Sequence, residues 1–360
     1  MREVLEFDFS KLNLRGAITG TIALAIVIVF IGELGTSVIA AGLAALFVVA
    51  GGPADTKRPD WNSLLLVVAG GLVTLAVGYS ADSVVWATIT LTLVTLLATL
   101  LALRGKRAAT MGVFGVLWAV IALSLGATAD TAAELSLAFV VGGAVALFAM
   151  LLASFSKSTA MEGIEDNNGA EDEDDVAADR RASPEAVHRA RVAIVKFAIF
   201  RALAVGACIY LGYTWFPEHT AWAALTFVLV VKPPPHQTVV VGVGRMLGTA
   251  LGVGIGVLTA LLAAGNTPVL VAVFVAAAYL MLATGKVNAA ISTMWTTVVL
   301  IVSQALMAEQ ATSAGWQRLL ATLLGVAFAF LIIVIMNAVA GQRQEKPPIA
   351  PVSPPSNASD

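Results

Sequence analysis

The sequence predicts an all-α polytopic membrane protein with twelve transmembrane helices. Hydrophobic residues make up 59% of the chain, charged residues only 12%, and the mean hydropathy is +0.89. Soluble domains carry about 25% charged residues. A membrane-spanning helix needs roughly 20 predominantly apolar residues, and the chain offers many such stretches. The basic residues also divide between the two sides of the predicted helices, which gives the helix count independent support.

Twelve apolar segments account for this fold class. Those of the first half lie near residues 16–32, 38–52, 63–79, 83–103, 110–127 and 133–155. Those of the second half lie near residues 194–215, 220–232, 243–264, 267–284, 287–307 and 319–340. The segments 38–52 and 220–232 are at the lower limit for a span, so tilt or their flanks would have to complete them.

The positive-inside rule predicts that both termini are cytoplasmic. With twelve crossings, 20 of the 21 basic residues fall in inner segments, and Arg318 is the exception. The predicted outer loops carry acidic residues instead: Glu33, Asp82, Asp130, Glu134, Glu218 and Glu309. We therefore expect a multi-pass protein of the plasma (inner) membrane.

Charge and composition divide the chain into four parts. Residues 1–155 and 194–340 form two membrane halves of six helices each, and 341–360 form a proline-containing, disordered tail. Between the halves, residues 156–193 are a charged cytoplasmic linker with too little apolar content to fold alone. Within the linker, Ser183 and Pro184 mark the start of a basic juxtamembrane helix, since Ser caps helices and Pro suits the first turn.

Internal repeats suggest duplication. Arg15 and Arg201 each open an apolar run that ends at an acidic turn. An even number of crossings per half makes the two halves parallel repeats. Within the second half, RMLGTALGV from Arg245 recurs as RLLATLLGV from Arg318, three crossings later. Each half is therefore a candidate 3+3 inverted repeat, an arrangement typical of transporters.

The chain is organised around residues 222–256, WAALTFVLVVKPPPHQTVVVGVGRMLGTALGVGIG. Its glycines at 244, 248, 252 and 256 fall every fourth residue and give a helix one smooth face. Such a face allows close approach of another helix, and ordinary membrane packing explains it better than a translocation path. Arg245 stands at the predicted start of this helix on the inner side, and Arg318 would lie on the outer side.

Cations gather at the inner helix ends of the second half, where Arg201, Lys232, Arg245 and Lys286 lie. An organic anion needs cationic or dipolar partners where its path leaves water. Each cation can alternatively set topology or meet lipid headgroups, but Arg318 violates the topology rule and recurs with Arg245. The candidate substrate path comprises Trp222, Thr226, Lys232, His236, Arg245, Gly248, Thr249, Gly252, Thr293 and Arg318.

The motifs WAALTFVLVVKPP, RMLGTALG and RLLATLLG resemble the fusaric acid resistance-like family. The resemblance is best over residues 195–340. It implies export of aromatic or other organic acid anions, driven by the proton gradient in bacterial members, or anion conduction as in the related aluminium-activated malate transporters. The first half departs from the pattern, because apolar residues near Val67 replace Arg245.

Other functional classes have less support. Three histidines with no metal-ligand spacing and no nucleophile motif argue against an enzyme, and no cofactor or metal site is expected. No carboxylate falls at a predicted mid-membrane position, so a proton-coupling residue is not visible. The expected partners are a small organic anion and the lipid bilayer, not nucleic acid. An anion channel, a non-transporting membrane scaffold and a homo-oligomer stay open as alternatives.

Overall fold

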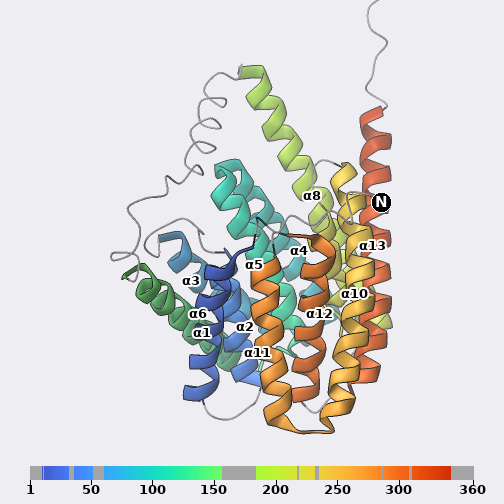
Figure 1. Ribbon diagram of the computed structural model, residues 1–360. Coiled ribbons are helices and arrows are strands. Elements are labelled where there is room, and N and C mark those ends of the chain that lie inside the picture. The colour runs from blue at the N-terminus through green and yellow to red at the C-terminus, as the bar shows by residue number, and fades with distance from the viewer. Residues whose placement is uncertain are drawn as a thin grey trace, which may run out of the picture.

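A computed structural model describes residues 10, 12–31, 36–51, 61–155, 184–216, 219–231, 235–285, 287–307 and 310–341. Within these ranges the regular structure consists of twelve α-helices and one 3-10 helix, without β-strands. Figure 1 shows the helices side by side in one bundle, with α8 and α13 extending beyond its upper end. The predicted all-α class is confirmed.

The described helices of the first half follow the predicted segments closely. They are α1 (Leu14–Ile31), α2 (Thr36–Gly51), α3 (Trp61–Ala81), α4 (Val84–Leu100), η2 (Leu101–Arg104), α5 (Lys106–Ser124) and α6 (Ala132–Phe155). Glycines at 105 and 126 adopt positive φ angles of 115° and 74°, which L side chains rarely adopt, and they stand at the two ends of α5.

The helices of the second half differ more from the predicted segments. They are α8 (Pro184–Trp215), α9 (Trp222–Val230), α10 (Pro235–Ala263), α11 (Thr267–Thr284), α12 (Ala289–Leu306) and α13 (Ala311–Gly341). Helix α8 runs unbroken from Pro184, so the predicted boundary at 193 and 194 lies inside a continuous helix. Both α10 and α13 begin about two turns earlier than their apolar segments, because their first turns are polar.

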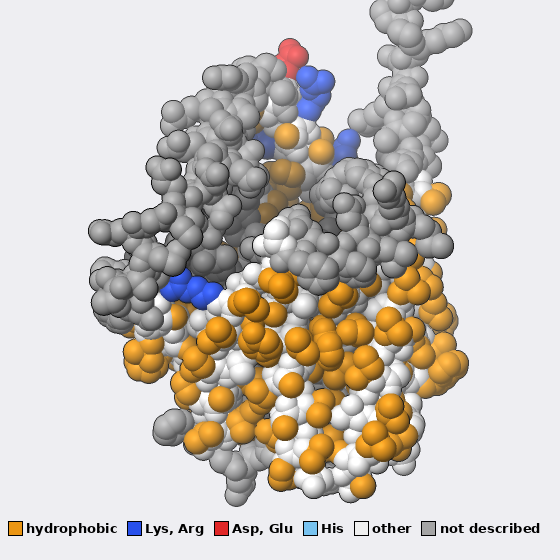
Figure 2. Space-filling view, in the orientation of Figure 1, with side chains coloured by type: hydrophobic (Ala, Val, Ile, Leu, Met, Phe, Trp, Pro, Cys, Tyr) orange, Lys and Arg blue, Asp and Glu red, His pale blue; other side chains and the backbone are white. Residues whose placement is uncertain are grey.

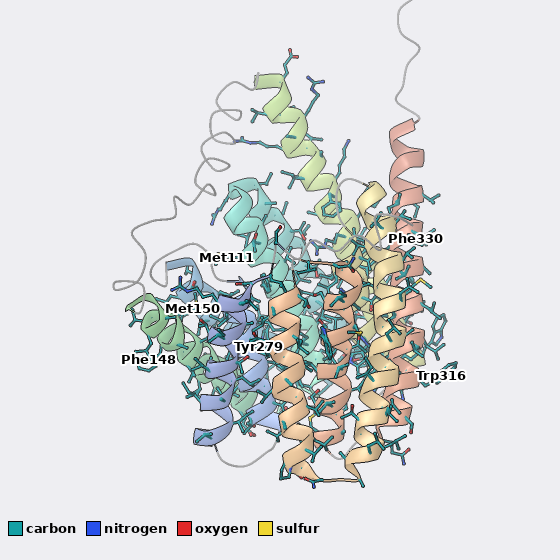
Figure 3. All side chains as sticks on the ribbon, in the orientation of Figure 1. Met111, Phe148, Met150, Tyr279, Trp316 and Phe330 are labelled. Atoms are coloured by element: carbon teal, nitrogen blue, oxygen red, sulfur yellow. The ribbon has the colours of Figure 1, made fainter. Side chains whose placement is uncertain are left out.

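Eight helices are long and apolar enough to cross a membrane by length and composition: α3, α4, α6, α8, α10, α11, α12 and α13. Three shorter apolar helices lie over residues 14–29, 37–50 and 108–124. Apolar side chains cover the lower part of the face in Figure 2, and its basic side chains lie above them. Phe148 and Trp316 project outward from opposite sides of the bundle (Figure 3). This arrangement is that of a multi-pass membrane protein.

Helix α9 is too short to cross a bilayer alone, since nine residues make a helix about 14 Å long. Its flanks extend its reach. A methyl group at Gly212, near the end of α8, would collide with Thr220 O, and one at Gly242, near the start of α10, would lie 3.5 Å from Val230. Residues 219–231 therefore return the chain from the end of α8 to the start of α10.

Equivalent helix pairs pack together in the two halves. Helix α6 packs against α2 and α3, as α13 packs against α9 and α10. The halves join through α1 with α11 and through α4 with α8, and Asn13 N donates to Ala283 O at 3.0 Å. The order of the pairs is therefore the same along both halves.

The glycine face of α10 packs against the backbone of α12, as the four-residue glycine spacing predicts. A methyl group at Gly252 would come within 2.5 Å of Met294 O and 2.7 Å of the Thr297 Cβ. One at Gly248 would collide with Ala290 O, and one at Gly256 would meet Ile301 at 2.9 Å. The close approach of the two helices therefore depends on the missing side chains.

We predict that Gly252→Ala lowers the thermal unfolding midpoint in detergent, because the added methyl forces two backbones apart at a cost of about 1–3 kcal/mol. Gly254→Ala is the matched control, since a methyl at Gly254 meets nothing within 4 Å. Equal midpoints for the two variants would contradict this account of the α10–α12 contact.

Candidate functional site

Helix α9 lies inside the bundle, and eight of its nine residues are buried. A helix whose ends are buried must find partners for its terminal backbone groups within the protein. Helices α5, α8, α10 and α13 pack around it. Arginines from two of these neighbours, α8 and α13, reach the opposite ends of α9.

Arg201 on α8 holds the C-terminal end of α9. Its Nη2 donates to Val228 O at 3.1 Å, and its guanidinium carbon lies 5.9 Å from the Phe197 ring centroid. Val228 is in the last turn, where the carbonyl has no partner within the helix. A cation at a helix C-terminus is also favoured by the helix dipole. Arg201, which is 5% exposed, therefore has a structural role.

Arg318 on α13 lies at the opposite, N-terminal end of α9. Its guanidinium carbon is 5.5 Å from the Trp222 ring centroid, within cation–π range, and its Nη1 donates to Trp222 O at 3.5 Å. The Trp222 ring stacks in turn on His219, with the ring centroids 3.8 Å apart. Arg318 is completely buried.

Arg245 lies inside the bundle, not at a helix start. Helix α10 begins ten residues earlier, at Pro235, so Arg245 is about 15 Å along it, and the side chain is only 7% exposed. Arg318 is likewise about 10 Å along α13. The two arginines therefore lie buried on two helices that pack against each other, where like charges repel. The sequence expectation places one cation at each mouth, whereas the structure buries both arginines inside the bundle.

The arginine pair has unused hydrogen-bond donors. Nε and Nη2 of both Arg245 and Arg318 are buried and have no partner among the described residues. From Arg189 to Gly341 the sequence contains only two acidic residues, Glu218 and Glu309, and both lie outside the described residues. Ionisable groups inside membrane helices are costly and mark binding or translocation sites. Two adjacent cations with free donors suit an oxygen anion.

Each arginine of the pair has a threonine one turn further along its helix. Thr249 follows Arg245 and Thr322 follows Arg318 by four residues, which places each threonine on the face of its arginine. Both threonines are buried, and neither hydroxyl has a partner among the described residues. The recurring sequence R-x-x-x-T therefore brings the same two side-chain types into the interior from two helices.

These two helices run in opposite directions. A methyl group at Gly242 would meet the Phe330 ring at 3.3 Å, and one at Gly315 would meet Val253 and Val257 at 2.9 Å. Early residues of α10 thus face late residues of α13. This is the relation that an inverted repeat requires.

The glycine that ends each copy of the motif makes an equivalent contact. A methyl group at Gly325 on α13 would lie 2.5 Å from Ala223 O and 2.7 Å from the Thr226 Cβ of α9. Gly252 faces Met294 O and Thr297 of α12 at the same two distances. Thr322 and Gly325 were not among the sequence candidates, although the repeat RLLATLLG contains the signal for both.

The structure brings together only part of the predicted substrate path. Trp222 and Arg318 are joined by the contacts above, and Thr226 lies beside Gly325. Arg245 is buried on the neighbouring helix α10, and Thr249 shares its face. Gly248, Gly252 and Thr293 lie in the close contact between α10 and α12. Lys232, the side chain of His236 and the nearby Lys286 lie outside the described residues.

The corresponding interior of the first half is apolar. The Trp118 ring packs at a tilt against the Phe139 ring, with the centroids 4.3 Å apart, and its Nε1 donates to the Thr74 hydroxyl at 2.7 Å. A methyl group at Gly70 would collide with the Phe139 ring. Among the described residues of this half, the buried polar side chains are all serine or threonine. The buried arginines therefore belong to the second half.

A family model described as fusaric acid resistance protein-like matches residues 203–332. This confirms the family resemblance over most of α8–α13, including Arg245 and Arg318. No curated protein and no solved structure matched the chain. The family match and the apolar helices together indicate a multi-pass membrane protein of the transporter type.

We predict opposite stability effects for two buried arginines. Arg245→Met should raise the free energy of unfolding or leave it unchanged, because replacing a buried, unpaired charge by an apolar side chain is often stabilising by about 1–4 kcal/mol. Arg201→Met should lower it by about 1.5–3 kcal/mol, because the charged hydrogen bond to Val228 O is lost. Thermal unfolding in detergent measures the stability of both variants. A destabilisation by Arg245→Met as large as that by Arg201→Met would contradict the different roles assigned to the two arginines.

Proposed function

We propose that this protein carries organic anions across the membrane and binds them between Arg245 and Arg318. The observation that carries the proposal is the burial of both arginines, which have free donors and no carboxylate partner among the described residues. An anionic oxygen would pair with both guanidinium groups, and the hydroxyls of Thr249 and Thr322 would complete its surroundings. Trp222 would offer an apolar wall beside the charged group.

The family match supports the direction and the substrate class. Its description names resistance to fusaric acid, an organic acid, and removal of such a compound from the cell would confer resistance. We therefore propose outward transport of aromatic or related organic acid anions. The burial of both arginines favours a carrier over an open channel, because a channel would keep its cations in contact with water.

We further propose twelve crossings, with α9 and its flanks as a short crossing and with both termini and the residues between α6 and α8 in the cytoplasm of the plasma (inner) membrane. The division of basic residues and the matching helix pairs of the two halves support this layout. It divides the chain into two parallel six-helix halves, joined by the charged linker and followed by a tail. Labelling of a single cysteine at position 170, after replacement of Cys208, should occur only from the cytoplasmic side.

We predict that Arg245→Ala weakens organic anion transport roughly tenfold or more. A hydrogen bond to a charged group is worth about 1.5–3 kcal/mol, and each 1.4 kcal/mol changes an equilibrium tenfold. Arg245→Lys should keep part of the activity, because the charge remains while the planar two-point geometry is lost. The measurement is uptake and efflux in proteoliposomes across a panel of organic acids, at matched protein content.

Arg189→Ala is the control, since Arg189 is exposed on the part of α8 that extends beyond the bundle. It should transport like the parent protein. If Arg245→Ala also transports at the parent rate and affinity, Arg245 does not contact the anion and the site assignment fails.

A further inference from the structure

We infer that transport is an obligatory exchange, in which one anion leaves the site only when another takes its place in the return step. The inference rests on the proposed anion site between Arg245 and Arg318. It concerns the coupling of transport and not the identity of the anion.

The charge of the site comes from the arginine pair and cannot be removed by the protein. Arginine stays protonated under all physiological conditions. Arg245 and Arg318 repel each other, and Arg318 has no contact with solvent. A bound anion therefore supplies the negative charge that balances the pair.

The other groups around the site do not supply that charge. The hydroxyls of Thr226, Thr249 and Thr322 are neutral dipoles. His219, stacked on Trp222, is a titratable group beside the site, and its protonation would add positive charge. Proton binding to these side chains therefore does not stabilise an unloaded site.

A carrier cycle has a loaded step, in which the site moves with its anion, and a return step, in which the site can move unloaded. The charge imbalance affects these two steps differently. During reorientation the site is closed to water on both sides. The loaded site then holds a neutralised or nearly neutralised pair, whereas the unloaded site holds two adjacent, desolvated cations. An uncompensated buried charge is strongly destabilising, which should slow the unloaded return step by about a hundredfold or more. Efflux without an incoming anion then stalls, whereas outward transport in exchange for an incoming anion continues.

The test uses the full-length protein in proteoliposomes preloaded with radiolabelled benzoate, nicotinate or malate. Valinomycin and equal potassium remove the membrane potential. Efflux is measured into sucrose-balanced HEPES buffer, with or without the same unlabelled acid outside. We expect efflux about a hundredfold faster with the external acid. Equal efflux rates with and without the external acid would overturn the inference and leave the proposed transport intact. Net efflux driven by a pH gradient alone would do the same. Absence of flux of all three acids in every condition would overturn the proposed function itself.

Variants test the electrostatic cause. Arg318→Gln removes one of the two charges, so the rate ratio between exchange and net efflux should fall at least tenfold, whereas Arg318→Lys should keep it. Arg189→Gln is the matched control at an exposed arginine and should leave the ratio unchanged. Glu218→Gln and Glu309→Gln should also leave it unchanged. A ratio that depends on either glutamate would show that the protein supplies the counter-charge, which would overturn the inference.

Discussion

Two guanidinium groups buried on the packed helices α10 and α13, inside an apolar helix bundle, are the constraint on which this structure depends. Burial and mutual repulsion both raise the free energy of Arg245 and Arg318, so the surrounding helices must hold them there. The packing of α10 on α12 and of α13 on α9, through Gly252 and Gly325, fixes the two helices that carry the pair. Arg201 fixes the far end of α9 by its bond to Val228 O. Close backbone contacts thus hold the two helices that carry these unfavourable charges.

Some helix contacts of α1–α6 have counterparts among α8–α13, but the interiors of the two sets differ. Equivalent pairs pack in both, yet the first half fills its centre with Trp118, Phe139 and neighbouring aromatic rings. The hydrogen bond from Trp118 to Thr74 satisfies the polar atom of that ring. Such a core stabilises the bundle without any ligand. Within the described residues, the chain thus combines a structural half with a half that carries the candidate site.

Much of the fold could be predicted from hydrophobicity and spacing. The all-α class follows from composition, and the close approach of α12 follows from the glycines at 248 and 252. Helix starts could not be predicted in this way. The first turns of α10 and α13 carry polar residues such as Gln237 and Ser313. These turns therefore lie outside the apolar runs that predict the helices.

The late predicted helix starts also give wrong positions for Arg245 and Arg318 along their helices. Placed at opposite helix ends, Arg245 and Arg318 looked like separate cations at two entrances. Once α10 and α13 gain their first turns, both arginines lie in the interior of antiparallel helices. Their pairing depends on the register between helices far apart in sequence, which a single sequence does not contain. The shared R-x-x-x-T motif indicates an equivalence between the two positions, but not the packing of their helices against each other.

Direct observation of a bound anion tests the central claim most directly. The measurement is an anomalous difference map from crystals of the protein grown with 4-iodobenzoate, whose iodine marks the ring and whose carboxylate resembles that of an aromatic acid. The account predicts an iodine peak inside the second half, beside Trp222, with the carboxylate between the guanidinium groups of Arg245 and Arg318. A ligand bound elsewhere, in crystals of protein that exchanges 4-iodobenzoate, would contradict it.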